Sequence, residues 1–133
     1  MKKILFTLAL LLTFVGTISA EVLKMKATSV AYKYENEYGY WTDWTDWEEC
    51  SILVVVDVDG DRITIYSSTP QEYDIYDSEY EESDGEGGTI QTFHSVDKDG
   101  SRCDLRIRIT KDGDVQLYVD YSDVMLVYNV EMK

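Results

Sequence analysis

The segment from Trp41 to Trp47 is the part of the sequence whose residue types and spacing most clearly suggest chemistry. It reads Trp-Thr-Asp-Trp-Thr-Asp-Trp, a triplet that occurs twice and is closed by a third tryptophan. Indole rings stack on the C–H faces of sugars, and carboxylates beside them accept hydrogen bonds from sugar hydroxyls. The sequence therefore predicts a ligand site made by Trp41, Trp44, Trp47, Tyr40, Asp43 and Asp46.

A structural role for the same tryptophans stays open. Tryptophan and tyrosine are favoured in strands and cover the ends of barrels well. In a regular strand Trp41 and Trp47 would share one face and Trp44 would lie on the other. A bulge in this Asp- and Thr-rich stretch would change that distribution.

An acidic, tyrosine-rich stretch from Tyr73 to Glu86 is a second candidate surface. It is either a solvated strand and loop or a docking surface for a basic protein, with tyrosines as the contact anchors. The docking residues would be Tyr73, Tyr76, Tyr80, Glu81 and Glu82.

Two Asp-Gly segments, 57–61 and 97–101, resemble the start of a calcium loop. Such a loop needs glycine at its sixth position and an acid at its twelfth. Counting from Asp57 or from Asp97 places an arginine at the sixth position in both. These segments are therefore predicted to be turns between strands, and we expect neither a metal nor a cofactor.

Catalysis is not expected. His94 is the only histidine, and the sequence contains no Gly-x-Ser-x-Gly, no His-Glu-x-x-His and no phosphate-binding loop. We expect His94 to be hydrogen-bonded and partly buried. Three arginines in an acidic protein are expected to pair with acids on adjacent strands, or else to bind an anionic group of a ligand; they are Arg102, Arg106 and Arg108.

The charge excludes whole classes of partner. The 133 residues include 12 basic and 26 acidic side chains, which gives a net charge of −14. Such a chain repels nucleic-acid phosphates and anionic membrane surfaces.

The first twenty residues are typical of a secretory signal peptide. Two lysines precede an apolar run, and small residues lead to a cleavage site after Ala20. We expect residues 21–133 to form one domain in the periplasm or outside the cell, with no membrane attachment after cleavage. Cys50 and Cys103 could then form a disulfide, or remain two buried thiols.

Residues 21–133 show no sustained helical period. Turn signals recur every 8–14 residues or so, with β-branched and aromatic runs between them, which predicts an all-β protein. Short connections favour an antiparallel up-and-down meander of eight or nine strands that closes into a small lipocalin-like barrel; a two-sheet sandwich is the alternative.

The alternation of apolar and charged residues in 102–109 predicts a core face with Cys103 and a solvent-exposed face with the arginines. Residues 52–56 are apolar on both faces, and we expect the aromatic segment to cover them.

Two resemblances add to this reading. Gly39-Tyr40-Trp41 resembles the Gly-x-Trp near the first strand of lipocalins, although here a full strand precedes it and no helix is evident before the C-terminus. The leader together with segments 38–49, 51–57 and 117–130 resembles a group of small secreted proteins of Gram-negative gut bacteria without an assigned activity. These resemblances imply secretion and a compact β domain, and they carry over no functional residue.

The sequence as a whole predicts a secreted or periplasmic, non-enzymatic binding module. Its ligand would be a glycan or a small apolar molecule, held at the tryptophan segment or at a barrel mouth. The alternative is an acidic interaction or inhibitor domain that docks a basic secreted protein.

Overall fold

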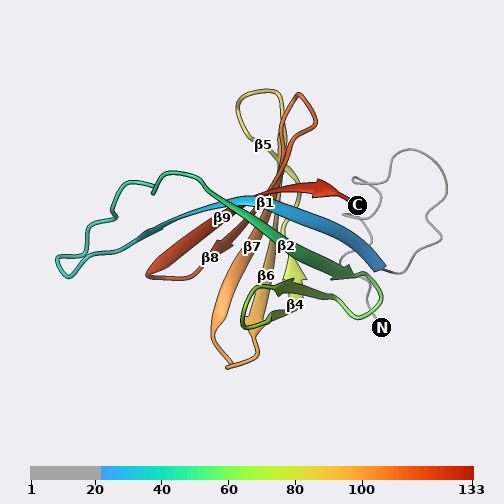
Figure 1. The fold of residues 1–133 in the computed structure, drawn as a ribbon, viewed down its shortest axis with the longest axis horizontal. Coiled ribbons are helices and arrows are strands. Elements are labelled where there is room, and N and C mark those ends of the chain that lie inside the picture. Colours follow the sequence, from blue (N-terminus) through green and yellow to red (C-terminus); the bar gives the residue numbers. More distant parts are fainter. Residues whose placement is uncertain (1–21) are drawn as a thin grey trace.

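The protein is a closed antiparallel barrel (Figure 1). The computed structural model describes residues 22–133, and the predicted leader, residues 1–20, lies outside this range. No helix long and apolar enough to span a membrane occurs in the described part of the chain. The strands are β1 Val22–Tyr34, β2 Glu48–Asp57, β3 Arg62–Tyr66, β4 Gln71–Ser78, β5 Glu82–Ser83, β6 Thr89–Asp97, β7 Arg102–Ile109, β8 Val115–Asp120 and β9 Val124–Met132.

Strand order follows the chain around the barrel. The order is β4-β3-β2-β1-β9-β8-β7-β6, and a direct pairing of β4 with β6 closes the ring of eight. The two-residue β5 pairs with β6 as an extra strand. The predicted all-β, up-and-down barrel is therefore confirmed, and the sandwich alternative is wrong. Closure leaves the eight main strands without free edges.

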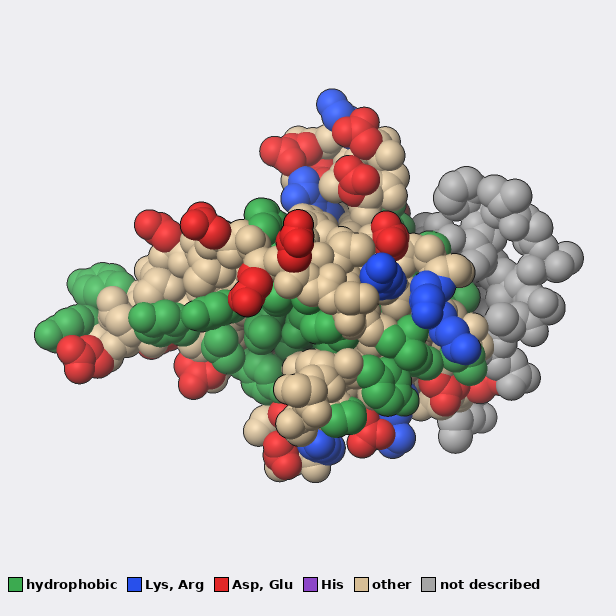
Figure 2. Space-filling view, in the orientation of Figure 1, with side chains coloured by type: hydrophobic (Ala, Val, Ile, Leu, Met, Phe, Trp, Pro, Cys, Tyr) green, Lys and Arg blue, Asp and Glu red, His purple; other side chains and the backbone are tan. Residues whose placement is uncertain are grey.

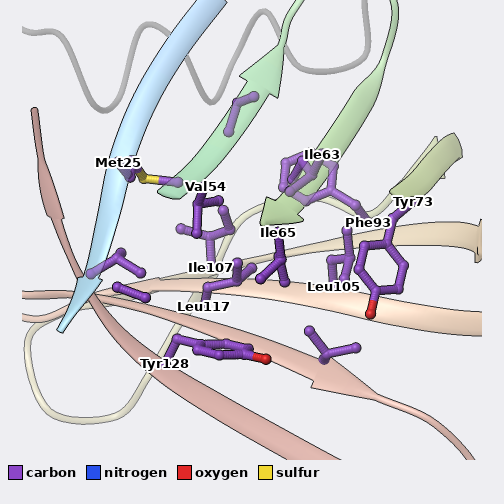
Figure 3. Packing of buried hydrophobic residues seen from close by; sticks show 14 of the residues in the cluster. Met25, Val54, Ile63, Ile65, Tyr73, Phe93, Leu105, Ile107, Leu117 and Tyr128 are labelled. Atoms are coloured by element: carbon purple, nitrogen blue, oxygen red, sulfur yellow. The ribbon is translucent and has the colours of Figure 1, made fainter. Parts of the chain in front are cut away.

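The barrel interior is filled by alternate side chains from all eight main strands (Figure 3). The core face predicted for β7 is confirmed, because Cys103, Leu105 and Ile107 are buried while the charged residues that alternate with them are more exposed. The largest fully buried side chains are Tyr73, Phe93, Met25, Ile63, Ile65, Leu105, Ile107, Leu117, Val54 and Val56.

A bulge at Thr28 changes which β1 side chains face the core. Opposite β9, Ala27 pairs with Val130 and Ser29 pairs with the very next residue, so Thr28 is an extra residue. Odd-numbered residues up to Ala27 point inward, whereas Val30 packs against the core after the bulge. Ala31 and Lys33 consequently lie on the outer face of the barrel.

The hairpin between β1 and β2 forms a projecting arm, defined here as residues 32–49. It reaches away from the barrel on the left of Figure 1. Residues 42–47 are not a strand, and Trp41 makes only an isolated bridge to Glu35. The prediction that this segment covers residues 52–56 is wrong. It lies instead over β1, β9 and β8, where it buries Ala31 and Val127 from outside the barrel.

Candidate functional site

Each Trp-Thr-Asp repeat is fastened to β1 by its threonine. The Thr45 amide donates to the carbonyl oxygen of Tyr32 (2.9 Å), and the Tyr32 amide donates back to Thr45 Oγ1 (3.0 Å). Thr42 makes the same pair of bonds with Tyr34, at 2.8 and 3.1 Å. Three residues of the repeat therefore match two residues of β1.

Because three residues of the repeat match two residues of β1, the tryptophans recur in the same direction, just as the threonine hydrogen bonds recur. Lys33 Nζ lies 5.7 Å from the ring centre of Trp41 and 4.8 Å from that of Trp44. Trp44 and Trp47 line the same groove. All three indoles thus lie on the outer side of the barrel, and the expected division between two faces is not found.

Aromatic rings and cations contact one another in a row across this outer surface. Beyond Lys33 and Trp44, the ring of Tyr118 meets Trp44 edge-on, with centroids 6.3 Å apart and an interplanar angle of 66°. The guanidinium of Arg106 covers the ring of Tyr118 at 4.2 Å. Such contacts stabilise by about 0.5–1 kcal/mol each at exposed sites, so together they hold the repeat against the barrel.

The predicted pairing with acids on an adjacent strand is confirmed for Arg106, whereas Arg108 pairs with acids of the loop before β6 and Arg102 makes no ion pair within residues 22–133. Arg106 makes two hydrogen bonds with Asp120. Arg108 Nε donates to Asp84 (3.0 Å), and its Nη2 donates to Glu86 (2.7 Å). Arg108 is therefore held in a fixed position at the edge of the groove.

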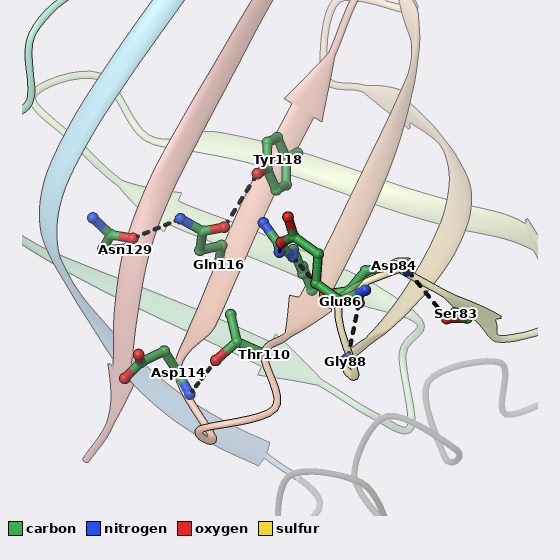
Figure 4. Close-up of polar contacts among 11 residues, drawn as sticks. Ser83, Asp84, Glu86, Gly88, Thr110, Asp114, Gln116, Tyr118 and Asn129 are labelled. Atoms are coloured by element: carbon green, nitrogen blue, oxygen red, sulfur yellow. Dashed lines mark hydrogen bonds and ion pairs between the residues drawn. The ribbon is translucent and has the colours of Figure 1, made fainter.

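The loop that carries Asp84 is ordered around this carboxylate (Figure 4). The Asp84 side chain is only 2% exposed and accepts the amides of Glu86 (2.7 Å) and Gly88 (2.8 Å) as well as Arg108. These bonds, the Glu86 amide first, lower the pKa of Asp84. The ionised carboxylate thus connects the loop to β7.

A groove of about 260 Å³ lies between the tryptophan repeat and the barrel wall. Trp44, Trp47 and Tyr118 supply aromatic walls, and Ala31 and Val127 supply an apolar floor. The full set of lining residues is Ala31, Trp44, Thr45, Trp47, Arg108, Gln116, Tyr118 and Val127.

A line of hydrogen bonds runs along the barrel surface to the groove (Figure 4). Asn129 Nδ2 donates to Ser29 Oγ (2.9 Å), and Gln116 Nε2 donates to Asn129 Oδ1 (3.0 Å). The Tyr118 hydroxyl then donates to Gln116 Oε1 (3.1 Å). The amide of Gln116 is thereby fixed in orientation where it lines the groove.

The predicted ligand residues are only partly brought together. Trp44 (39% exposed) and Trp47 (49%) line the groove, and Trp41 (38%) lies beyond Lys33. Tyr40 is at the end of the arm, and Asp43 and Asp46 are exposed outside the groove lining.

Sequence reasoning missed the groove residues that the barrel wall contributes. They come from the outward positions of β1, β7, β8 and β9, which alternate with core residues and so look like ordinary solvated positions. An aromatic residue among them, Tyr118, was the one available signal.

The second predicted surface contains one clear error. Tyr73 is 1% exposed and belongs to the core, because it shares the inward face of β4 with Ile75. Tyr76 and Tyr80 are exposed, at 52% and 94%, as are Glu81 and Glu82. Tyr73 therefore cannot contribute to a docking surface at this position.

His94 is hydrogen-bonded and half-buried, as predicted. Its Nδ1 lies 2.7 Å from Asp104 Oδ1 and its Nε2 lies 3.1 Å from Glu79 Oε2. The ring also stacks on Tyr76, with centroids 6.3 Å apart. Both ring nitrogens face carboxylates, so the arrangement favours the doubly protonated imidazolium.

We expect the pKa of His94 to lie above its ordinary value of 6.5, chiefly because of the hydrogen bond to Asp104. Its contribution to stability is then complete below the unfolded pKa and is lost as the pH rises through the folded pKa. Partial solvent exposure limits this contribution to less than about 1 kcal/mol.

Because the sequence has a single histidine, one imidazole C–H proton resonance reports the titration of His94 directly. The Asp104→Asn variant should titrate lower, and an unchanged midpoint in that variant would contradict the assignment.

A second hollow, of about 370 Å³, opens at one end of the barrel. The Tyr121 hydroxyl donates to Asp97 (2.7 Å), and the Tyr73 hydroxyl donates to Gln71 (2.7 Å). Lys98 Nζ donates to the Pro70 carbonyl. The polar side chains at this mouth therefore bond to one another or, for Lys98, to the backbone.

The two cysteines are free thiols, so the disulfide considered for Cys50 and Cys103 is not formed. They lie on β2 and β7, which are not neighbours in the barrel. Cys50 Sγ lies 3.6 Å from the Ala27 carbonyl oxygen, and Cys103 Sγ lies 3.2 Å from Ser95 Oγ. Burial raises the pKa of Cys103, which keeps this thiol protonated.

Within residues 22–133, no group of three His, Cys, Asp or Glu side chains is arranged to hold a metal ion. No protein-family model, curated protein or solved structure matches the chain.

Proposed function

We propose that the protein is an exported, non-enzymatic binding module that holds a short glycan in the groove beside the tryptophan repeat. The observation that carries this proposal is the enclosure of about 260 Å³ by Trp44, Trp47 and Tyr118 on the outer barrel surface. The leader-like residues 1–20 support export.

The groove offers what a sugar ring needs. Trp47 is the most exposed of the three indoles, whereas Lys33 already covers the ring of Trp44. A pyranose can therefore stack its C–H face on Trp47 above the apolar floor. At the polar side, the oriented amide of Gln116 has a second N–H and a second lone pair for hydroxyl groups.

The polar lining favours a glycan over a wholly apolar ligand. Gln116 and Arg108 would lose hydrogen-bonding water to an apolar molecule without replacement. The lining also supports binding rather than turnover. It contains neither a carboxylate nor a histidine among the described residues, and these side chains are the usual general acids and bases.

The test is calorimetric titration of residues 21–133 with chitotriose, cellotriose and maltotriose. We expect one of these sugars to bind and Trp47→Ala to weaken it roughly tenfold, since loss of one aromatic stacking partner costs about 1.4 kcal/mol. Binding should change little with salt, because no net charge is exchanged.

Trp41→Ala is the matched control, because Trp41 belongs to the same repeat but does not line the groove. It should keep wild-type affinity. Equal losses of sugar affinity in both variants would show that the tryptophan repeat supports binding only by stabilising the fold, and not by contacting the sugar. Binding of the apolar dye N-phenylnaphthylamine, with no sugar bound, would replace the glycan proposal with an apolar ligand.

A further inference from the structure

The end of the arm is a hydrogen-bonded turn rather than a loose loop. The Asn36 amide donates to the Tyr40 carbonyl (2.8 Å), and Asn36 Oδ1 accepts the amides of Tyr38 (2.9 Å) and Tyr40 (3.1 Å). Gly39, at φ +82°, donates its amide to the Asn36 carbonyl (3.0 Å). The conformation of the tip is therefore set by its own bonds.

The body of the arm is also fixed. Thr42 and Thr45 bind it to β1, and Lys33 lies against two of its tryptophans. Next to the tip turn, the Glu35 amide donates to the carbonyl of Asp123 in the turn between β8 and β9 (2.9 Å). A partner would meet a segment that has already lost most of its conformational freedom, which reduces the entropic cost of binding.

This rigid tip carries two tyrosines that the fold does not use. Tyr38 is 77% exposed and Tyr40 is 72% exposed. Hydrophobic side chains gather at the far left end of the molecule, with acidic side chains beside them (Figure 2). Exposed aromatic side chains on a rigid support are the residues that most often dominate the binding energy of an interface.

Apart from Lys33, which lies against Trp41 and Trp44, the charged side chains of the arm are all acidic. Residues 34–61 contain no lysine or arginine, while the arm carries Glu35, Glu37, Asp43, Asp46, Glu48 and Glu49. A partner surface must therefore be cationic to approach it, and complementary charge would steer the encounter. A second copy of this chain, at a net charge of −14, is a poor match.

We infer that the arm tip is a docking element that inserts Tyr38 and Tyr40 into a cationic cleft of a partner protein. The tyrosines supply the buried contact, and the acidic side chains face the basic rim of the cleft. This site is separate from the groove, so it holds whether or not a glycan binds there.

Photo-crosslinking followed by titration tests the inference. Tyr38 is replaced by p-benzoylphenylalanine, and the irradiated protein is exposed to an extract and culture medium of the producing cells. Tyr80 carries the same replacement in the control, because it is even more exposed than Tyr38 and also flanked by acids. We expect an adduct specific to position 38 whose partner, identified by mass spectrometry, has a basic surface.

The purified partner is then titrated with wild type and variants. Tyr38→Ala/Tyr40→Ala should weaken binding roughly tenfold or more, as expected for loss of interface anchors. Raising the salt from about 50 to about 500 mM should weaken it by a similar factor. Tyr80→Ala and Trp47→Ala should leave the affinity unchanged.

Three results would overturn the inference. The first is no adduct at position 38 above that at position 80. The second is an adduct with this chain itself or with an acidic protein. The third is an affinity that is insensitive to salt or depends on Tyr80 instead. Loss of sugar binding in Trp47→Ala with partner binding intact would separate the two sites.

Discussion

Replacing Phe93 by alanine is expected to lower the free energy of unfolding by about 3–5 kcal/mol. Phe93 is fully buried, and its strand pairs with β7 at Leu105 and with β4 at Ser78. Because β4 and β6 close the barrel, the cavity would form beside the pairing that seals the ring. A loss of this size is a large part of the 5–15 kcal/mol or so that stabilises a typical domain.

Urea denaturation followed by two signals measures the effect. Far-UV circular dichroism reports on the strands, whereas fluorescence reports on Trp41, Trp44 and Trp47 in the arm. We expect both midpoints to fall together in Phe93→Ala, because the arm is clipped to β1. Tyr80→Ala is the control and should unfold like wild type, since Tyr80 is 94% exposed. A change below about 1 kcal/mol in Phe93→Ala would be inconsistent with the packing described.

Replacing Gly88 by alanine is expected to cost about 2–3 kcal/mol, at the upper end of the usual penalty for overpacking. A Cβ at Gly88 would lie 2.4 Å from the Ile109 carbonyl oxygen, 2.6 Å from Asp84 Oδ2 and 2.9 Å from Thr110 Cα. Two of these atoms are backbone, so the loop must move away from β7. That movement would strain the hydrogen bond between Asp84 and Arg108.

Gly85→Ala gives the informative comparison. A Cβ at Gly85 meets nothing within 4 Å, but its φ of +80° is unfavourable for alanine. Its cost should therefore be about 1–2 kcal/mol and purely conformational. Only Gly88→Ala should also change glycan affinity, because Arg108 lines the groove. Equal midpoints for the two variants in thermal denaturation would contradict the close contact at Gly88.

The strands could be predicted because their signal is local. In β7, alternate residues such as Leu105 and Ile107 face the core, and period-two alternation needs no knowledge of the rest of the chain. The same alternation would have placed Tyr73 on the core face of its strand with Ile75. The many acids around Tyr73 obscured this alternation, because the composition of a segment does not show which face a given residue takes.

The groove could not be predicted because it depends on contacts between distant segments. The outward turn of Lys33 follows from the bulge at Thr28, which an alternation pattern does not reveal. The hydrogen bonds that Thr42 and Thr45 make with β1 depend on the register of the hairpin. Tyr118 reaches Trp44 only because a single strand, β9, separates β8 from β1 in the barrel.

The hydrogen bonds of Thr42 and Thr45 to β1 restrict the lengths that the arm can have. An insertion that preserves this pattern of bonds must add three residues to the segment 41–47 and two residues to β1. Two strand residues span about 7 Å, so the reach of the tip changes in steps of that length. Each step also adds one indole to the outer surface. Reach and aromatic area are thus coupled, and a longer arm in a relative of this protein would carry a fourth tryptophan at the same three-residue spacing.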